Sequence, residues 1–451
     1  MKFRKFGQVG LALVVSLGLG FGVTSCSTDH TVGYFYVTGT QYQQISGFRI
    51  DNNLGQLTPT QNSPYSSNGV NPTKILVSTA GKFVYVLNAG CGGTGQIACP
   101  PNTPADETGA NISLFTVGGQ GGLSFQASYT SQGNSPIAIQ ADASGTHLFV
   151  LDSTVPDTPL DKANCKGYVP GDEATVCGDI TAFNIDGNTG RLSLITNQQV
   201  KNSAGTNLTY FPVGSSPINF FLLPNGSFIY TIENGYTGNC KIPSPPVNCT
   251  IDPPQGVFVY ANSAGQLTLT QNTPIPSNAE QLSYIYASAK YVYLIDAGQS
   301  VNPSGLILPY TVGTNGALQS LVGGQWPNTG TVANPGPMIV DHQNRFLYLA
   351  NMGPNLTPSS EASSVSAFFI DPSTGRLSNI TTTVPFGSGS SPRCILEDPS
   401  NQYLYTANFA DSTVTGAIIN SATGTLLTLR KSSSFGTTGQ PTWCAATGTL
   451  F

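Results

Sequence analysis

Apolar and polar residues alternate along much of the chain, and one short alternating run occurs seven times. In each copy two ring-bearing residues flank an apolar residue. The copies are YFYVTG from Tyr34, FVYVLN from Phe83, HLFVLD from His147, FIYTIE from Phe228, YVYLID from Tyr291, FLYLAN from Phe346 and YLYTAN from Tyr403. A period of two residues is typical of β-strands, and repetition at this scale predicts a repeat architecture.

Each run lies inside a longer unit. Most units begin with a proline-led segment, such as NPTKILVSTAGK before Phe83, and end with a second alternating run and a Gly-x-Leu signal. Segments such as DPSTG between the runs are typical of hairpin turns, because Gly and Asn accept positive φ angles. Each unit is therefore predicted to form four antiparallel strands. The proline-led segment is the first and the aromatic run is the second.

Seven four-stranded sheets around an axis form a β-propeller, in which repetition protects the sheet edges. A β-helix would need shorter coils, and separate sandwiches would need linkers. The run from Tyr34 has no proline-led strand before it, and the proline-led segment from Gln440 has no aromatic run after it. We predict an all-β, seven-bladed propeller over residues 31–451, with the N-terminal strand closing the ring.

The N-terminal 25 residues have a different character. MKFRKF is basic and VGLALVVSLGLGFGV is apolar, which is typical of an export signal rather than a membrane span. The following VTSC, ending at Cys26, resembles a bacterial lipobox. We predict a lipoprotein signal peptide over residues 1–25 and a lipidated tether over 26–30, with ordinary secretion as the alternative. The protein is expected in the bacterial cell envelope, at the outer membrane because Ser27 is not Asp.

Eight of the nine cysteines lie beyond the leader, and export permits disulfides. Three consecutive insertions after the second strand hold one cysteine pair each. No histidine lies in these loops, so local disulfides are favoured over metal sites. The predicted pairs are Cys91 with Cys99, Cys165 with Cys177, and Cys240 with Cys249. Cys394 and Cys444 lie near the starts of first strands in neighbouring blades, where a disulfide and two buried thiols both stay open.

Charged residues are sparse, at 9% of the chain. Loss of Lys2, Arg4 and Lys5 with the leader leaves 14 basic and 22 acidic residues, a balance of −8. Nucleic acid is not an expected partner, because phosphate binding needs a basic face. The expected partners are the membrane, through the lipid anchor, and a glycan, a protein or a small lactone. The propeller is expected to be monomeric.

A propeller gathers the starts of its first strands and the ends of its second strands at one mouth of the central channel. Lys74 and Glu280 are predicted to lie there. Six of the seven second strands end in a polar residue, namely Asn88, Asp152, Glu233, Asp296, Asn351 or Asn408. These side chains either close the following turn or face the mouth. In the second case Asp152, Glu233 and Asp296 are candidate oxygen ligands for Ca²⁺.

The repeats resemble the seven-bladed lactonase propellers, the family of cyclic-type 6-phosphogluconolactonase, and the related YVTN repeat proteins. NPTKILVSTAGKFVYVLN, SPRCILEDPSNQYLYTAN and VSAFFIDPSTGRLS carry this resemblance, which covers essentially the whole mature chain. The family's Pro-Arg-His stretch reads Pro392-Arg393-Cys394 here. The resemblance implies that Arg393 stabilises a carbonyl oxyanion, while the family's histidine is absent.

The three histidines do not replace it. His30 lies in the tether, and the positions of His147 and His342 in their repeats predict that both lie on the opposite face. Export, low charge and the elaborated loops favour a non-catalytic surface propeller that binds a glycan or a protein, which is our main prediction. The resemblance favours the alternative, a lactonase that hydrolyses a sugar-acid lactone through Arg393.

Lipidation at Cys26 can be tested directly. Cys26→Ser should abolish incorporation of a radioactive fatty acid in a bacterial host and release the protein from the membrane fraction, because the substitution removes the acylated thiol. Ser27→Ala, which keeps the cysteine, should remain labelled. Labelling of Cys26→Ser at the level of the unmodified chain would contradict the assignment.

Overall fold

The computed structural model describes residues 30–91, 109–156, 177–202, 204–233, 256–270, 275–276, 279, 282–288, 290–297, 305–321, 326–327, 334–353, 363–380 and 386–448. All regular secondary structure in these ranges is β-strand. Within them, no helix has the length and hydrophobicity that crossing a membrane requires. The expected signal peptide and Cys26 lie outside the described residues.

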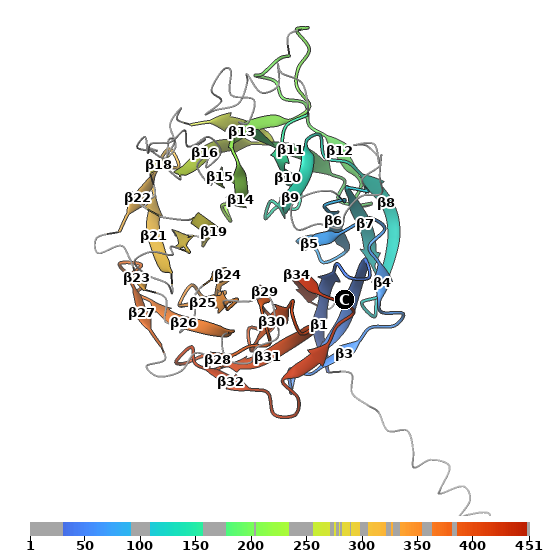
Figure 1. Ribbon diagram of the computed structural model, residues 1–451, viewed down its shortest axis with the longest axis vertical. Coiled ribbons are helices and arrows are strands. Elements are labelled where there is room, and N and C mark those ends of the chain that lie inside the picture. Colours follow the sequence, from blue (N-terminus) through green and yellow to red (C-terminus); the bar gives the residue numbers. More distant parts are fainter. Residues whose placement is uncertain are drawn as a thin grey trace, which may run out of the picture.

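Seven antiparallel sheets surround a central axis (Figure 1). We number them as blades 1 to 7 and give their strands from the axis outward. Blade 1 contains β34 (Pro441–Gly448), β1 (Thr31–Gly39), β2 (Gln44–Asp51), β3 (Leu57–Pro59) and β4 (Tyr65–Ser66). Blade 2 contains β5 (Pro72–Val77), β6 (Phe83–Asn88), β7 (Asn111–Val117) and β8 (Leu123–Tyr129). Blade 3 contains β9 (Asn134–Ala141), β10 (His147–Thr154), β11 (Cys177–Ile185), β12 (Leu192–Leu194) and β13 (Phe211–Ser215).

The other four blades repeat this order. Blade 4 contains β14 (Pro217–Leu222), β15 (Phe228–Glu233), β16 (Gly256–Ser263), β17 (Gln266–Leu269) and β18 (Ile275–Pro276). Blade 5 contains β19 (Leu282–Ala287), β20 (Tyr291–Asp296), β21 (Leu306–Val312), β22 (Leu318–Ser320) and β23 (Trp326–Pro327). Blade 6 contains β24 (Pro335–Val340), β25 (Phe346–Asn351), β26 (Ser364–Ile370), β27 (Leu377–Asn379) and β28 (Phe386–Gly387). Blade 7 contains β29 (Pro392–Glu397), β30 (Tyr403–Asn408), β31 (Thr413–Ile419), β32 (Leu426–Thr428) and β33 (Ser434–Gly436).

The outermost strand differs from the simple four-strand prediction. Blade 2 has one continuous strand, β8, whereas each other blade has two short strands that both pair with the third strand. Short interrupted strands at a sheet edge expose little unpaired backbone to another chain. The split therefore refines the predicted blade without changing its topology.

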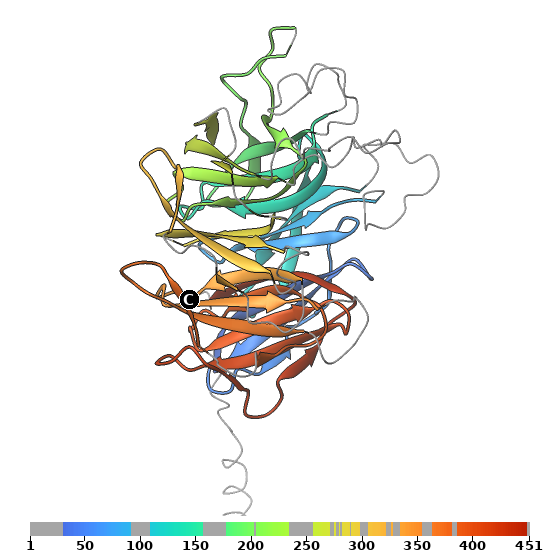
Figure 2. The same cartoon turned by 60° about the vertical axis from the view of Figure 1, so that its left-hand side comes forward.

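The predicted closure of the ring is confirmed. The C-terminal strand β34 pairs antiparallel with β1, with Tyr36 opposite Ala445 and Val37 opposite Cys444. Blade 1 thus takes its innermost strand from the C-terminal end of the chain and its other strands from the N-terminal end. Figure 2 shows the same ring turned by 60°, with the blue and red parts of the chain next to each other.

The hydrophobic core is a ring of separate clusters rather than one central mass. Seven clusters of buried residues in the described chain each combine side chains of two neighbouring blades. At the junction of blades 7 and 1, for example, Phe35 packs against Tyr405 with ring centroids 5.3 Å apart. The stability of each blade therefore depends on its two neighbours.

The aromatic run and the Gly-x-Leu signal are two halves of one contact between blades. In five blades the tyrosine at the third position of the run donates a buried hydrogen bond to the signal glycine of the next blade. The pairs are Tyr36 to Gly121 O (2.8 Å), Tyr85 to Gly190 O (2.7 Å), Tyr230 to Gly316 O (2.8 Å), Tyr348 to Gly424 O (2.9 Å) and Tyr405 to Gly55 O (2.8 Å).

The geometry of this contact requires glycine. The five glycines have φ angles between 64° and 74°, a backbone region that residues with a side chain rarely adopt. The aromatic side chain at the first position of the run also packs against this glycine of the next blade. A Cβ added to Gly55 would lie 2.5 Å from Cδ1 of Tyr403, and one added to Gly121 would lie 2.1 Å from Cδ1 of Tyr34.

Blade 5 provides an internal control for this bond. Tyr293 occupies the same position and is fully buried, but its hydroxyl has no hydrogen-bond partner among the described residues. Tyr405→Phe should lower the free energy of unfolding by about 1–2 kcal/mol, because it leaves the carbonyl of Gly55 buried and unsatisfied. Tyr293→Phe should cost nothing or stabilise slightly. Urea denaturation of both variants measures the difference, and equal losses would show that the hydroxyl bond contributes nothing.

Candidate active site

A cavity of about 520 Å³ lies at the channel mouth, and all seven innermost strands contribute to it. Its walls are the first residues of these strands, joined by Met352 and Phe409, which follow the second strands of blades 6 and 7. A volume of this size lies within the usual range for small-molecule sites. The lining residues used below are Thr73, Lys74, Asn219, Ser283, Tyr284, Arg393, Thr442 and Trp443.

One backbone feature, repeated in every blade, positions these side chains. Just after each innermost strand begins, its register with the second strand shifts. A bulge inserts an unpaired residue and turns its side chain. The residues left out of register all line the cavity and are Thr442, Thr73, Ile137, Ile218, Ser283, Arg393 and, in β24, Gly336 with Pro337.

Two cations and two large aromatic rings meet in this cavity. The Lys74 Nζ atom lies 3.3 Å from the centroid of the Trp443 ring. The Arg393 guanidinium lies 5.3 Å from the centroid of the Phe409 ring. The rings of Tyr284 and Trp443 have their centroids 6.5 Å apart and are tilted by 32°. Lys74, Trp443 and Arg393 come from blades 2, 1 and 7, which are consecutive around the closure of the ring.

The electrostatic balance of the cavity is positive. Burial, reinforced by the positive charge of Arg393, lowers the pKa of the Lys74 amine to about 7. The face of Trp443 acts in the opposite sense, because a cation over an indole ring is stabilised. Burial also lowers the pKa of Arg393, but a guanidinium remains charged at neutral pH. Among the described residues, those that line the cavity include no Asp, Glu or His, so this part of the site suits an anion or a developing oxyanion.

Hydroxyl groups complete the polar part of the site. The Ser283 Oγ is buried and has no hydrogen-bond partner in the described part of the chain, so it can bond to a ligand. Thr442 is already engaged, because its hydroxyl donates to the carbonyl of Pro72 at 2.7 Å. Burial raises the pKa of Tyr284 well above its usual value, which keeps the phenol neutral.

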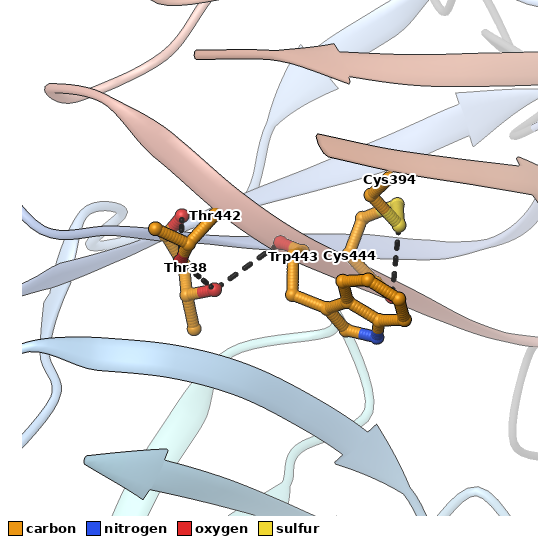
Figure 3. Close-up of a disulfide and its surroundings, with 5 residues drawn as sticks. All are labelled: Thr38, Cys394, Thr442, Trp443 and Cys444. Carbon is orange, nitrogen blue, oxygen red and sulfur yellow. Dashed lines mark hydrogen bonds between the residues drawn. A yellow bond between two sulfur atoms is a disulfide. The ribbon is translucent and has the colours of Figure 1, made fainter. Parts of the chain in front are cut away.

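A disulfide lies directly behind the site (Figure 3). It joins Cys394 of β29 to Cys444 of β34, with Cα atoms 5.8 Å apart, and settles the open choice between a bridge and two thiols. Each cysteine adjoins a site residue, Arg393 and Trp443 respectively. On the other side of β34, the hydroxyl oxygens of Thr38 and Thr442 lie 2.9 Å apart. The strands that present Arg393 and Trp443 are thus fixed covalently to each other.

Comparison with known proteins identifies the family. The family model described as "Lactonase, 7-bladed beta-propeller" matches residues 26–155 and 256–444. The chain belongs to this lactonase family. No curated protein matches the sequence.

Solved structures agree on the fold of this lactonase-family propeller. It is similar to a putative 6-phosphogluconolactonase from Bacteroides fragilis NCTC 9343, with 15% identity, 93% of this chain and 99% of the other covered, and a TM-score of 0.60. A putative 6-phosphogluconolactonase from Bacteroides uniformis ATCC 8492 gives 14% identity, 92% and 100% coverage, and a TM-score of 0.62. The periplasmic gluconolactonase of Pseudomonas aeruginosa gives 15% identity, 93% and 100% coverage, and a TM-score of 0.60.

The lactonase-family structure brings together two of the predicted mouth residues, Lys74 and Arg393. Glu280 lies outside the described residues. The asparagines Asn88, Asn351 and Asn408 end their strands as predicted, but they are fully buried inside their blades and do not line the cavity. Their side-chain amides donate to hydroxyls on the third strand, namely Ser113 from Asn88, Ser364 and Ser366 from Asn351, and Thr413 and Thr415 from Asn408.

The structure does not bring Asp152, Glu233 and Asp296 together. They are buried in three different blades, and in the described ranges no three His, Cys, Asp or Glu residues gather as metal ligands. The reason is that the second strand is one strand away from the axis. Asp152, for example, accepts a 2.7 Å hydrogen bond from Ser131 and lies opposite Asp179 of β11. Burial raises the pKa of Asp152 to about 7.

In four blades a glycine explains how the polar side chain at the strand end fits. Gly69, Gly133, Gly214 and Gly389 each precede the polar strand end of their blade by 19 residues. A Cβ on any of them would meet that side chain, at 2.5 Å for Asn88 and 2.0 Å for Glu233, for example. The 19-residue spacing is therefore a signal, visible in the sequence but not used above, that the polar residue at the strand end has a structural role.

The remaining histidines and cysteines lie elsewhere. His147 bonds to Asp142 at 2.7 Å and His342 to Glu397 at 2.6 Å, and neither histidine lines the cavity. Cys91 and Cys177 are disulfide-bonded. Their predicted partners, and both cysteines of the third local pair, lie outside the described residues, so those pairings stay predictions. The four cysteines outside the described residues are Cys99, Cys165, Cys240 and Cys249.

The Cys394–Cys444 disulfide should contribute strongly to stability, because it closes a loop with a sequence separation of 50 residues. The double variant Cys394→Ala and Cys444→Ala should lose about 3–4 kcal/mol of unfolding free energy on the loop-entropy model. Denaturant unfolding under oxidising conditions measures this loss against the unmodified chain, in which Cys91 and Cys177 are disulfide-bonded as in the variant. A double variant as stable as the oxidised chain would show that the disulfide adds nothing to the free energy of unfolding.

Proposed function

We propose that the channel mouth hydrolyses a sugar-acid lactone, with Arg393 stabilising the carbonyl oxygen and Lys74 serving as the base. The observation that carries this proposal is the pair of cations in a partly buried cavity, whose lining in the described part of the chain includes no carboxylate. Family membership supports it. So do the names of two similar structures, a putative 6-phosphogluconolactonase and a periplasmic gluconolactonase.

The lactone would lie between the two cations. The guanidinium of Arg393 donates hydrogen bonds to the carbonyl oxygen, where negative charge develops as water adds to the carbonyl carbon. The rings of Trp443 and Tyr284 provide apolar faces for the C–H bonds of a sugar ring. The buried hydroxyl of Ser283 can bond to a substituent of the ring.

Lys74 can transfer the protons that the reaction needs. Its neutral amine accepts a proton from the attacking water, and the resulting ammonium donates it to the ring oxygen when the C–O bond breaks. The product is a hydroxy acid, which ionises to a carboxylate. A pKa of about 7 leaves a large neutral fraction at neutral pH, as a general base requires.

We therefore favour the lactonase, which was the alternative, over the main prediction of a non-catalytic surface propeller. A cationic cavity of about 520 Å³ at the channel mouth is suited to a small molecule. We also propose that the enzyme acts outside the cytoplasm as a lipid-anchored protein, on the basis of its leader and Cys26.

Hydrolysis of glucono-1,5-lactone and related aldonolactones should depend on both cations. Lys74→Met should lower kcat by about 10²–10⁴-fold because the base is lost. Arg393→Ala should lower it by about 10²–10³-fold because the oxyanion loses its donors. Lys82→Met, which removes an exposed lysine of the same blade, should leave kcat unchanged.

The pH profile adds a second criterion. After subtraction of spontaneous hydrolysis, the enzymatic rate should rise as pH increases through about 7, because only the neutral amine of Lys74 accepts a proton. A pH-stat measures both the rate and its profile. Absence of turnover on every lactone of the panel, or full activity of both cation variants, would refute the proposal.

A further inference from the structure

The surroundings of the Lys74 amine are unusual for a lysine. A lysine ammonium that leaves bulk water normally has a carboxylate partner, but none of the ion pairs among the described residues includes Lys74 or Arg393. The amine lies over the Trp443 ring from β34 and feels the charge of the Arg393 guanidinium from β29, and the Tyr284 ring from β19 lines the same cavity. The lining therefore offers the amine two aromatic rings and a second cation.

These surroundings are suited to covalent chemistry. An amine attacks a carbonyl carbon only when it is neutral, and proteins activate a lysine for this purpose by desolvation or by a second cation nearby. Lys74 has both features. A guanidinium beside the amine adds a binding site for a planar carboxylate.

We propose that Lys74 forms a Schiff base with 2-oxo acids whose carboxylate binds to Arg393. The amine nitrogen adds to the keto carbon and gives a carbinolamine. Loss of one water molecule, made of the carbonyl oxygen and two protons, then leaves a carbon–nitrogen double bond. The carboxylate adjoins the keto carbon in a 2-oxo acid, so one small molecule can reach both cations.

Other features of the cavity support the same ligand class. The Ser283 hydroxyl, buried and without a partner in the described chain, can bond to the carbinolamine oxygen before water leaves. A planar imine can lie against the Trp443 ring. The pKa of Lys74, about 7, supplies the neutral amine at physiological pH. This activity uses the same cavity as the proposed lactonase but not the same reaction, so either can fail alone.

Reductive trapping tests the inference. The intact folded protein is incubated with pyruvate and sodium cyanoborohydride, which reduces an imine to a stable secondary amine, and labelled lysines are located by peptide mass spectrometry. Lys74 should be labelled at least tenfold more than the exposed Lys82 and Lys290 in the same sample. Labelling of Lys74 should increase as pH rises through about 7.

Two comparisons isolate the role of Arg393. Acetone has the carbonyl group of pyruvate without the carboxylate, so it should label Lys74 at least tenfold more slowly. In Arg393→Met this preference should disappear. In Lys74→Arg, with folding checked by its thermal transition, no adduct should form in the cavity.

Several outcomes would overturn the inference. These are equal labelling of Lys74 and the surface lysines, absence of a Lys74 adduct in folded protein, and equal rates for pyruvate and acetone. Lactone hydrolysis measured on the same preparation separates the two proposals. Hydrolysis without trapping would refute only the Schiff base, and trapping without hydrolysis would refute only the lactonase.

Discussion

The hydroxyl of a motif tyrosine and the carbonyl of a glycine in the next blade meet at buried junctions around the ring. The bond from Tyr405 to Gly55 is the member of this set that joins the last blade to the first. Each bond fixes how far one sheet is displaced relative to the next, because the adjoining ring of the same motif packs against the same glycine. Five of the seven hydrophobic clusters lie at these junctions, and there the polar contact fixes the register in which the apolar side chains pack.

The positions of the blades relative to one another also determine the shape of the candidate active-site cavity. Once the blades are held at fixed positions, the seven innermost strands converge, and the bulge near the start of each strand directs one or two residues into the channel mouth. The scaffold is independent of the identity of those residues. At the junction that closes the ring, three successive blades contribute Arg393, Trp443 and Lys74, and the Cys394–Cys444 disulfide fixes two of the three strands.

Much of this could be predicted from the sequence because the signals are local. The aromatic runs indicate second strands, and the unmatched ends at Tyr34 and Gln440 indicate a shared blade. Lys74 and Arg393 could be placed at the mouth by their distance from a strand-leading proline. Trp443 and Tyr284 were missed because sequence does not show which residue after the bulge turns inward. The role of Asp152 is harder to predict, since the end of a second strand lies one strand away from the axis and its side chain bonds to neighbouring segments of its own blade.

The disulfide also bears on which residue transfers protons. In the stretch that resembles the family's Pro-Arg-His, Cys394 occupies the place of the histidine, and its sulfur is bonded to Cys444. Neither an imidazole nor a thiol is therefore present there to accept a proton. Among the lining residues, Lys74 is the group whose pKa lies near neutrality, and it comes from the blade on the other side of Trp443. All seven innermost strands line the same cavity, so Lys74 on β5 and Arg393 on β29 both reach it. Both proposed activities, lactone hydrolysis and Schiff-base formation, therefore rest on Lys74.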